Sequence, residues 1–201
     1  KTITLRKLLK IKNNFILIEI RLCMGEKTTL EWTPGSMLTW FDFQAESNPA
    51  VFEDSHSVIK YRFTWVVNSE KIGENIVFLI DDIALFVEFH PLLSWVRQSE
   101  ANDSLLNHEQ GNFDLAELVK RENIQNLKEQ FYQKHFPTRG DNNEQRKQFA
   151  KEDSGEMIHK YVEKLQTLFD QRSQKYQNDT NHGGNLEEQS KYDLLFKQLR
   201  A

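Results

Sequence analysis

Asp81 and Asp82, two adjacent aspartates directly after an apolar run at residues 76–80, are the acids placed best for chemistry. Such a run is typical of a strand near the middle of a sheet, and carboxylates at strand ends often bind metal or transfer protons. A magnesium-dependent nuclease would add a Glu-x-Lys unit on the next strand, whereas Glu70 and Lys71 have no spacer. We therefore expect the aspartates to form a turn or a helix cap, or to contact a partner.

The histidines do not make up a metal site or a catalytic set in the sequence. Glu156, His159 and Glu163 share one side of a helix, but di-iron bundles need this Glu-x-x-His unit twice, with two further carboxylates. A solvated face or pairing within the helix is the simpler interpretation. His108 and Glu109 begin a zinc-protease motif that lacks its second histidine. The sequence thus gives no catalytic residue, no metal ligand and no cofactor to assign.

The net charge of −4 is unevenly distributed along the chain. Residues 13–112 carry six Lys and Arg against fifteen Asp and Glu, whereas residues 113–201 carry fifteen of each. An acidic surface repels nucleic acid and attracts basic proteins. The residues that we assign to binding such a partner are Asp42, Glu46, Glu53, Asp54, Asp81, Asp82 and Glu88.

The first twelve residues have the opposite sign. They contain no acid and five basic residues: Lys1, Arg6, Lys7, Lys10 and Lys12. These charges provide a route to nucleic acid, but without neighbouring aromatic residues they are more simply a solvated edge. We keep nucleic-acid contact as an alternative that the sequence does not favour.

Cysteine content and hydropathy bear on the compartment. Cys23 is the single cysteine, so no internal disulfide can form, which favours a reducing, cytoplasmic setting. The apolar run at residues 76–80 is far shorter than the roughly 20 residues needed to cross a bilayer, so we expect no membrane span. The chain begins at Lys1 rather than Met, which leaves open a preceding leader or domain.

Alternation of apolar and polar residues predicts the strands. The clearest case is residues 58–67, where Ile59, Tyr61, Phe63, Trp65 and Val67 share one face. Further strands are predicted at residues 15–23, 28–32, 37–43 and 76–80, with turns at 33–36 and 68–75 and a polar loop at 44–57.

Two segments allow more than one interpretation. Residues 1–12 fit either a strand or a short helix. Residues 83–89 fit either another strand after a tight turn or a helix capped by Asp82. We favour a strand that ends at the aspartates and a helix around residues 91–98, because proline is acceptable in the first turn of a helix.

The pattern changes to a helical period in the second half of the chain. After a polar linker at residues 99–112, we expect a helix capped by Asn112 that ends before Pro137. Asp153 and Glu156 form a capping-box pattern for the next helix, and Asn185 caps the last one after a linker at residues 177–184. The apolar stripe at residues 154–176 can pack on the sheet or form a homo-oligomer contact.

Together these patterns predict an α+β protein. An antiparallel sheet of about five to six strands and a short closing helix occupy residues 1–98, and three to four helices from residues 113–201 pack on the sheet or on a partner. The expected function is that of a non-enzymatic module that presents an acidic surface to a basic protein, as immunity or antitoxin-like proteins do. The alternatives are a metal-dependent phosphodiester-cleaving enzyme that uses Asp81 and Asp82, and a nucleic-acid-associated assembly subunit.

Overall fold

The strongest alternation in the sequence becomes one strand of a long two-stranded ribbon in a computed structural model, which describes residues 3–11, 14–22 and 29–201. Strand β5 (Ile59–Ile72) runs antiparallel to β6 (Asn75–Phe89), and Gly73, with φ +62°, makes the turn between them. The side chains predicted to face inward, from Ile59 to Val67, are buried or half-buried, and the intervening ones are exposed. The ribbon therefore has one covered and one solvated face.

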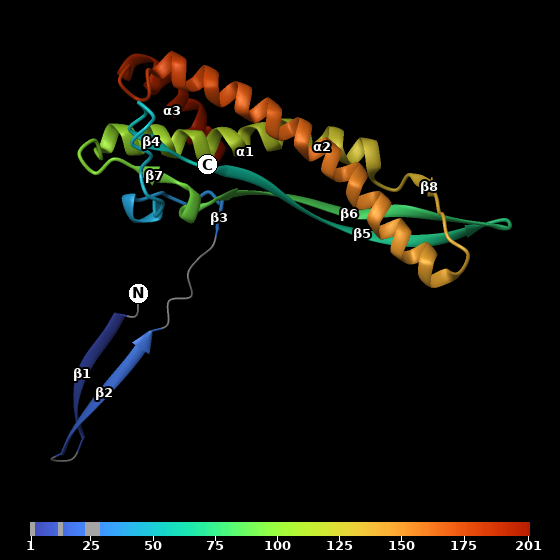
Figure 1. The fold of residues 1–201 in the computed structure, drawn as a ribbon, viewed down its shortest axis with the longest axis horizontal. Coiled ribbons are helices and arrows are strands. Elements are labelled where there is room, and N and C mark those ends of the chain that lie inside the picture. The colour runs from blue at the N-terminus through green and yellow to red at the C-terminus, as the bar shows by residue number, and fades with distance from the viewer. Residues whose placement is uncertain (1–2, 12–13, 23–28) are drawn as a thin grey trace.

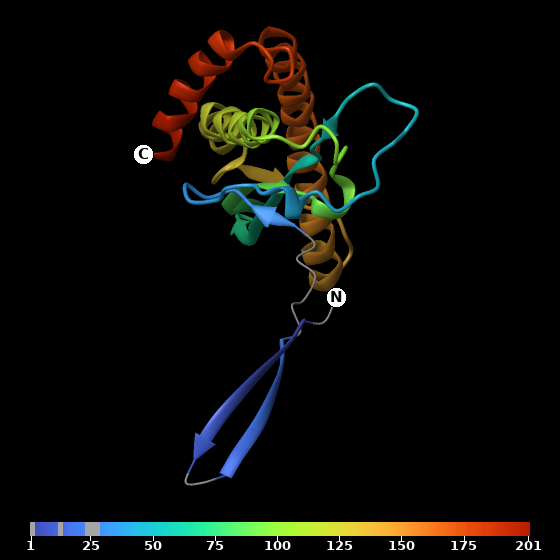
Figure 2. The same cartoon turned by 90° about the vertical axis from the view of Figure 1, so that its left-hand side faces the viewer.

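Three helices of the described chain lie on the covered side of the ribbon (Figures 1 and 2). Helix α1 (Asp103–Phe131) packs on β6, and α2 (Asn143–Thr180) packs on β5 and on α1. Helix α3 (Leu186–Arg200) packs on α1 and α2 rather than on the ribbon. Helix α1 is thus enclosed by the ribbon and the other two helices.

The α+β class, with the antiparallel strands mainly in the first half of the chain, is confirmed. The strands nevertheless form three sheets among the described residues instead of one. Next to the ribbon, β3 (Leu30–Glu31) and β8 (His135–Pro137) pair with β6, while β4 (Ser55–His56) pairs separately with β7 (Trp95–Val96). The expected strand at residues 28–32 is therefore reduced to two residues.

The third sheet is the N-terminal hairpin, formed by β1 (Ile3–Ile11) and β2 (Asn14–Leu22). The open choice for the first residues is settled as a strand, and the strand predicted at residues 15–23 is confirmed to Leu22. Three of the five basic residues proposed for nucleic-acid contact lie on β1, where Arg6 is opposite Glu19 in the register. Lys1 and Lys12 lie outside the described residues.

Asp81 and Asp82 lie inside β6, where the strand carries a β-bulge. The two aspartates together oppose the single residue Val66 of β5. The bulge allows Ile80 and Ile83 both to be buried, because the extra residue restores the alternation after the interruption. The predicted turn or helix cap is wrong: the strand continues for seven residues beyond the aspartates, to Phe89.

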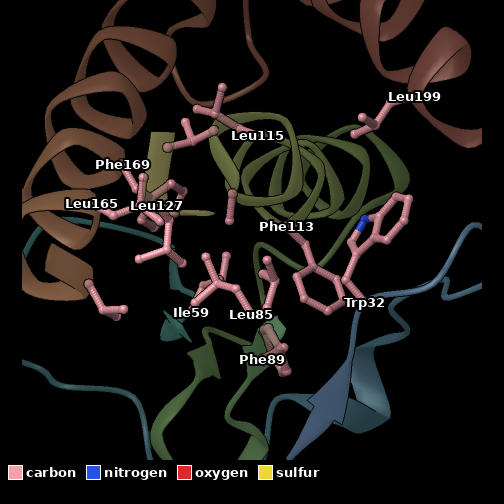
Figure 3. Close-up of a cluster of buried hydrophobic side chains, with 14 of the residues drawn as sticks. Trp32, Ile59, Leu85, Phe89, Phe113, Leu115, Leu127, Leu165, Phe169 and Leu199 are labelled. Carbon is pink, nitrogen blue, oxygen red and sulfur yellow. The ribbon is translucent and has the colours of Figure 1, made fainter. Parts of the chain in front are cut away.

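The core lies between the ribbon and the helices (Figure 3). Phe89, at the end of β6, packs against Phe113 of α1 and against Phe43, which lies in the segment between β3 and β4. The ring centroids are 6.0 and 5.2 Å apart. Buried side chains in this cluster include Trp32, Ile59, Leu85, Leu115, Leu127, Leu165, Phe169 and Leu199. The aromatic alternation of β5 therefore serves mainly to build this core.

Several predicted helix limits are wrong. Helix α1 starts ten residues earlier than expected, with Asn102 as its cap, so residues 103–112 are helix rather than linker. Helix α2 starts at Asn143, capped by Asn142, and continues to Thr180. Local polarity misled both predictions, because the first turns of α1 and α2 lack an apolar stripe. The cap at Asn185 is confirmed by its hydrogen bond from the Glu188 amide.

Two predicted elements of the first half are replaced by short turns. Residues 37–43 form no strand. Instead the Leu38 amide donates to Gln110 of α1, and Trp40–Asp42 form a 3-10 turn, η1. The helix expected around residues 91–98 is limited to a 3-10 turn, η2 (Pro91–Leu93), because strand β7 begins at Trp95.

Gly111 permits the close packing of α1 on α2 and α3. A Cβ atom at this position would lie 2.8 Å from Cζ of Tyr176 and 3.1 Å from Cε2 of Phe196. The Tyr176 hydroxyl passes over the glycine to donate to the backbone oxygen of His108, at 3.1 Å. The glycine is therefore required by contact rather than by backbone conformation.

Gly111→Ala should destabilise the protein by about 1–3 kcal/mol through overpacking, against a helix-propensity gain of about 1 kcal/mol. Urea denaturation of Gly111→Ala and of the exposed control Asn126→Ala measures the difference, and the control should be close to neutral. In a Tyr176→Phe background the cost of the alanine should fall. A stabilised Gly111→Ala protein would contradict this packing.

Arg200 fastens α3 to α1 through a buried ion pair. Its guanidinium donates to both carboxylate oxygens of Asp114, with Nε 2.8 Å from Oδ2, and also to the backbone oxygens of Pro34 and Ser36. The Asp114 carboxylate also accepts from the Trp32 indole at 2.8 Å. One carboxylate thus joins helix α1, helix α3 and the segment after β3.

We expect Arg200→Ala to lower the free energy of unfolding by about 2–4 kcal/mol, because Asp114 would keep a buried charge without its cation. Because the side chain of Arg200 is 16% exposed and partly screened by solvent, the loss in free energy of unfolding should not exceed that for a wholly buried ion pair. Asp114→Asn in the Arg200→Ala background should recover part of the loss. Arg172→Ala, which removes an exposed pair with Glu122, should cost at most about 1 kcal/mol in the same denaturation assay.

Candidate functional site

Four of the seven acids predicted to bind a partner lie on one loop. Asp42 is the last residue of η1, and Glu46, Glu53 and Asp54 follow it before β4; all but the half-buried Asp42 are exposed. Residues 28–59, which include this loop, contain no Lys or Arg. We call residues 41–54, together with the adjacent turn Pro91–Leu93, the acidic rim.

The acidic rim is held in place by hydrogen bonds to its backbone and by one buried side chain. The amides of Gln44 and Ala45 donate to the backbone oxygens of Pro91 and Ser94, at 3.0 and 2.9 Å. Arg97 donates to the backbone oxygen of Val51 in the middle of the loop. Phe43 is buried against Phe89 in the core. The loop is therefore attached to the body although it projects from it, as the blue-to-cyan trace in Figure 2 shows.

Large apolar side chains are exposed on the same rim as the acids. Phe52 is 99% exposed and Phe41 is 91% exposed, and Leu92 and Leu93 of η2 are about half exposed, at 48% and 55%. Single exposed apolar residues are common on protein surfaces, but four on one connected rim are typical of an interaction site. Aromatic anchors with surrounding charge are also the pattern found at protein interfaces.

The other three predicted acids lie elsewhere. Asp81 and Asp82 are in the bulge of β6, where Asp81 accepts a hydrogen bond from Asn68 at 3.0 Å. Glu88 pairs with Arg62 on the solvated face of the ribbon, at 2.5 Å. The structure thus does not bring the seven acids together into one surface.

A second candidate site is centred on the middle of α1, where residues 108–117 are buried although many are polar. Both carboxylate oxygens of Glu109 accept hydrogen bonds from serine hydroxyls, Ser55 at 2.6 Å and Ser57 through a short contact. Asn112, one turn further, accepts from Ser173 of α2 at 2.8 Å. Buried polar side chains require such partners, and here the partners come from distant parts of the chain.

These side chains line a cleft of about 370 Å³ between β4, α1 and α2, which we call the polar cleft. The acids on its lining are Glu53, Glu109 and Asp170, and the cation is Lys60. Glutamine side chains of α2, Gln166, Gln174 and Gln177, add amide donors and acceptors, and His56 and His182 complete its titratable groups. A cleft with a buried carboxylate and several neutral hydrogen-bonding groups is suited to binding a polar ligand.

His108 lies beside the polar cleft in the tightly packed interior between α1 and α2. Its ring stacks on Tyr176 with centroids 4.6 Å apart, and Nδ1 lies 3.1 Å from the Thr180 hydroxyl. Burial lowers the pKa of His108 below its ordinary value, although the charge of nearby Glu109 acts in the opposite direction. Nε2 is buried without a hydrogen-bond partner among the described residues.

Sequence reasoning named the rim acids as candidates, which stays a prediction, and did not identify the polar cleft. His108 and Glu109 were tested only against a zinc motif, and the serines of β4 carry no motif. Within the described ranges no three His, Cys, Asp or Glu side chains form a metal-binding group. His159 and Glu163 form a pair along exposed α2, at 3.4 Å, as expected for a solvated face.

Comparisons with protein-family models, with curated proteins and with solved structures find no significant match to this chain. Among the helices of the described residues, none has the length and apolarity that crossing a membrane requires. The acidic rim and the polar cleft therefore have to be interpreted from their own geometry.

The lowered pKa of His108 predicts a loss of stability in mild acid. Below the ordinary histidine pKa of about 6.5 the unfolded chain binds the proton first, so the free energy of unfolding should fall as pH decreases from 7.5 to 5.5. A full proton difference corresponds to about 1.4 kcal/mol per pH unit. His90, whose pKa burial also lowers, contributes with the same sign.

Urea denaturation at several pH values measures this effect. His108→Gln should reduce the pH dependence between pH 7.5 and 5.5, whereas His159→Gln, at an exposed position, should leave it as in the wild type. Equal pH dependence in wild type and His108→Gln would show that His108 does not contribute.

Proposed function

We propose that this chain is a non-enzymatic protein-binding module whose acidic rim engages a basic protein, in the manner of immunity or antitoxin-like proteins. The observation that carries the proposal is the combination on one anchored loop of exposed acids with Phe41 and Phe52, which are almost fully exposed. The single Cys23 favours a reducing, cytoplasmic setting for this interaction.

Charge selects the partner's chemistry. The rim has four acids and neither Lys nor Arg, so a basic surface would be attracted at long range and an acidic one repelled. The aromatic side chains would then supply most of the affinity, because large apolar groups buried at the centre of an interface contribute most to binding. Asp42 has a further structural role, since its carboxylate accepts from the amide and hydroxyl of Thr39.

The test uses matched variants of the full chain. The rim variant combines Glu46→Gln, Glu53→Gln and Asp54→Asn, and spares Asp42 because of its structural hydrogen bonds. The control variant neutralises three exposed acids of α2 and carries Glu152→Gln, Glu156→Gln and Glu163→Gln. The wild-type chain is used to retain proteins from the soluble extract of the native host. The retained proteins are identified, purified and titrated against each variant by calorimetry.

We expect a basic protein that binds with 1:1 stoichiometry and more weakly at high salt. The rim variant should weaken binding by about tenfold or more, Phe52→Ala by about thirtyfold, and the control variant by less than about threefold. Retention of nucleic acid or of an acidic protein, equal affinity of the rim and control variants, or retention of nothing by the wild type would contradict the proposal.

A further inference from the structure

We infer that the polar cleft receives the guanidinium group of an arginine side chain from the basic partner. The inference rests on the proposed function and adds to it the residue that the partner inserts. The cleft adjoins the rim directly, because Glu53 belongs to both and Ser55 follows it by two residues.

The first argument is the surroundings of the Glu109 carboxylate. The residue is 5% exposed, and its hydrogen-bond partners are neutral groups, namely the hydroxyls of Ser55 and Ser57 and the side-chain amide of Asn112. No described Lys or Arg forms an ion pair with it. Neutral hydrogen-bond donors offset only part of the free-energy cost of removing a charged carboxylate from water. A cation that enters the cleft would offset more of that cost and would itself be bound by the carboxylate.

Comparison with the other buried acids of α1 supports this argument. Asp114 is paired with Arg200, and Glu117 is paired with Lys120 and Arg121. Glu109, by contrast, lines a cleft and forms no ion pair with a Lys or Arg of the described chain. The other two buried acids of the helix therefore indicate that a carboxylate in this setting pairs with a cation.

The second argument is the shape of the acceptor set. Around Glu109 the cleft offers the Asp170 carboxylate, serine hydroxyls and the amide oxygens of α2 glutamines, which come from different elements. A guanidinium has five N–H donors in a plane and can satisfy several such acceptors at once, whereas an ammonium is a point charge with three donors. A lining with more than one carboxylate favours arginine over lysine, because a guanidinium forms paired, directional hydrogen bonds to carboxylates.

The third argument is size and access. The volume of about 370 Å³ is at the lower end of ligand pockets and accommodates one long side chain with part of its backbone. Lys60 is the basic residue of the lining, and its side chain is exposed, so it can turn to solvent when a second cation enters.

The test uses N-acetyl-L-arginine N-methylamide as a probe, titrated into the 15N-labelled full chain and followed by NMR. Its citrulline analogue has nearly the same shape without the charge, and the lysine analogue has the charge without the planar group. We expect saturable shifts at Ser55, Ser57, Asn112 and Ser173 with a Kd of about 1–10 mM for arginine, and binding weaker by about tenfold for citrulline and about threefold for lysine.

Variants assign the binding to the cleft. Glu109→Gln should weaken arginine binding by about tenfold or more. Because Glu109 is buried and this variant can lose its fold, the exposed Asp170→Asn is tested too, with an expected loss of about threefold. Glu163→Gln, two turns earlier on α2, is the matched control and should bind as the wild type does.

The outcomes separate this inference from the proposed function. Equal binding of arginine and citrulline, or no saturable shift at the cleft residues, overturns the arginine pocket even if the rim binds a basic protein. Conversely, Phe52→Ala and Glu46→Gln lie on the rim outside the cleft and should leave binding of the free probe unchanged. Loss of probe binding in those two variants would also overturn the assignment to the cleft.

Discussion

Complete burial of the middle of helix α1 is the constraint on which the rest of the structure depends. Enclosed by the ribbon, α2 and α3, this helix exposes almost nothing between residues 108 and 117, so each polar side chain there needs a partner within the protein. Gln110 accepts a hydrogen bond from the backbone of the segment before η1, and Asn112 accepts one from α2. Asp114 accepts hydrogen bonds from Trp32 and Arg200. The polar residues of α1 therefore specify where each surrounding element packs.

The β-bulge in the ribbon keeps the other side of the core apolar. The helices require apolar side chains along the whole covered face of β6, but two consecutive polar residues interrupt the alternation. Placing Asp81 and Asp82 together opposite Val66 keeps Ile80 and Ile83 buried and leaves both carboxylates away from the core. A pair of acids that resembles an active site in the sequence is thus explained by strand geometry.

The elements predicted correctly from the sequence are those whose pattern depends on residues close together in the chain. The faces of β5, the strand predicted at residues 15–23 and the cap at Asn185 all depend on neighbours a few positions away, and all are confirmed, the strand as far as Leu22. The start of α1 was not, because His108, Glu109 and Asn112 are buried through contacts with residues more than 50 positions distant, and burial of polar groups leaves no periodic signal. The polar cleft was missed for the same reason, since β4, α1 and α2 meet only in the folded chain.

The acidic rim is connected to the core through backbone hydrogen bonds and the buried Phe43 side chain, and not through its exposed aromatic side chains. Phe43 and the amides after it fix the loop to the core and to η2, and Arg97 holds its centre, while Phe41 and Phe52 make almost no contact with the body. A backbone that is ordered before binding loses less conformational entropy when a partner docks, whereas a free loop would have to be ordered at the cost of affinity. The elements that bury α1 therefore also determine how the exposed side chains are presented, and a change that loosens Arg97 or Phe43 should weaken binding without removing a residue of the interface.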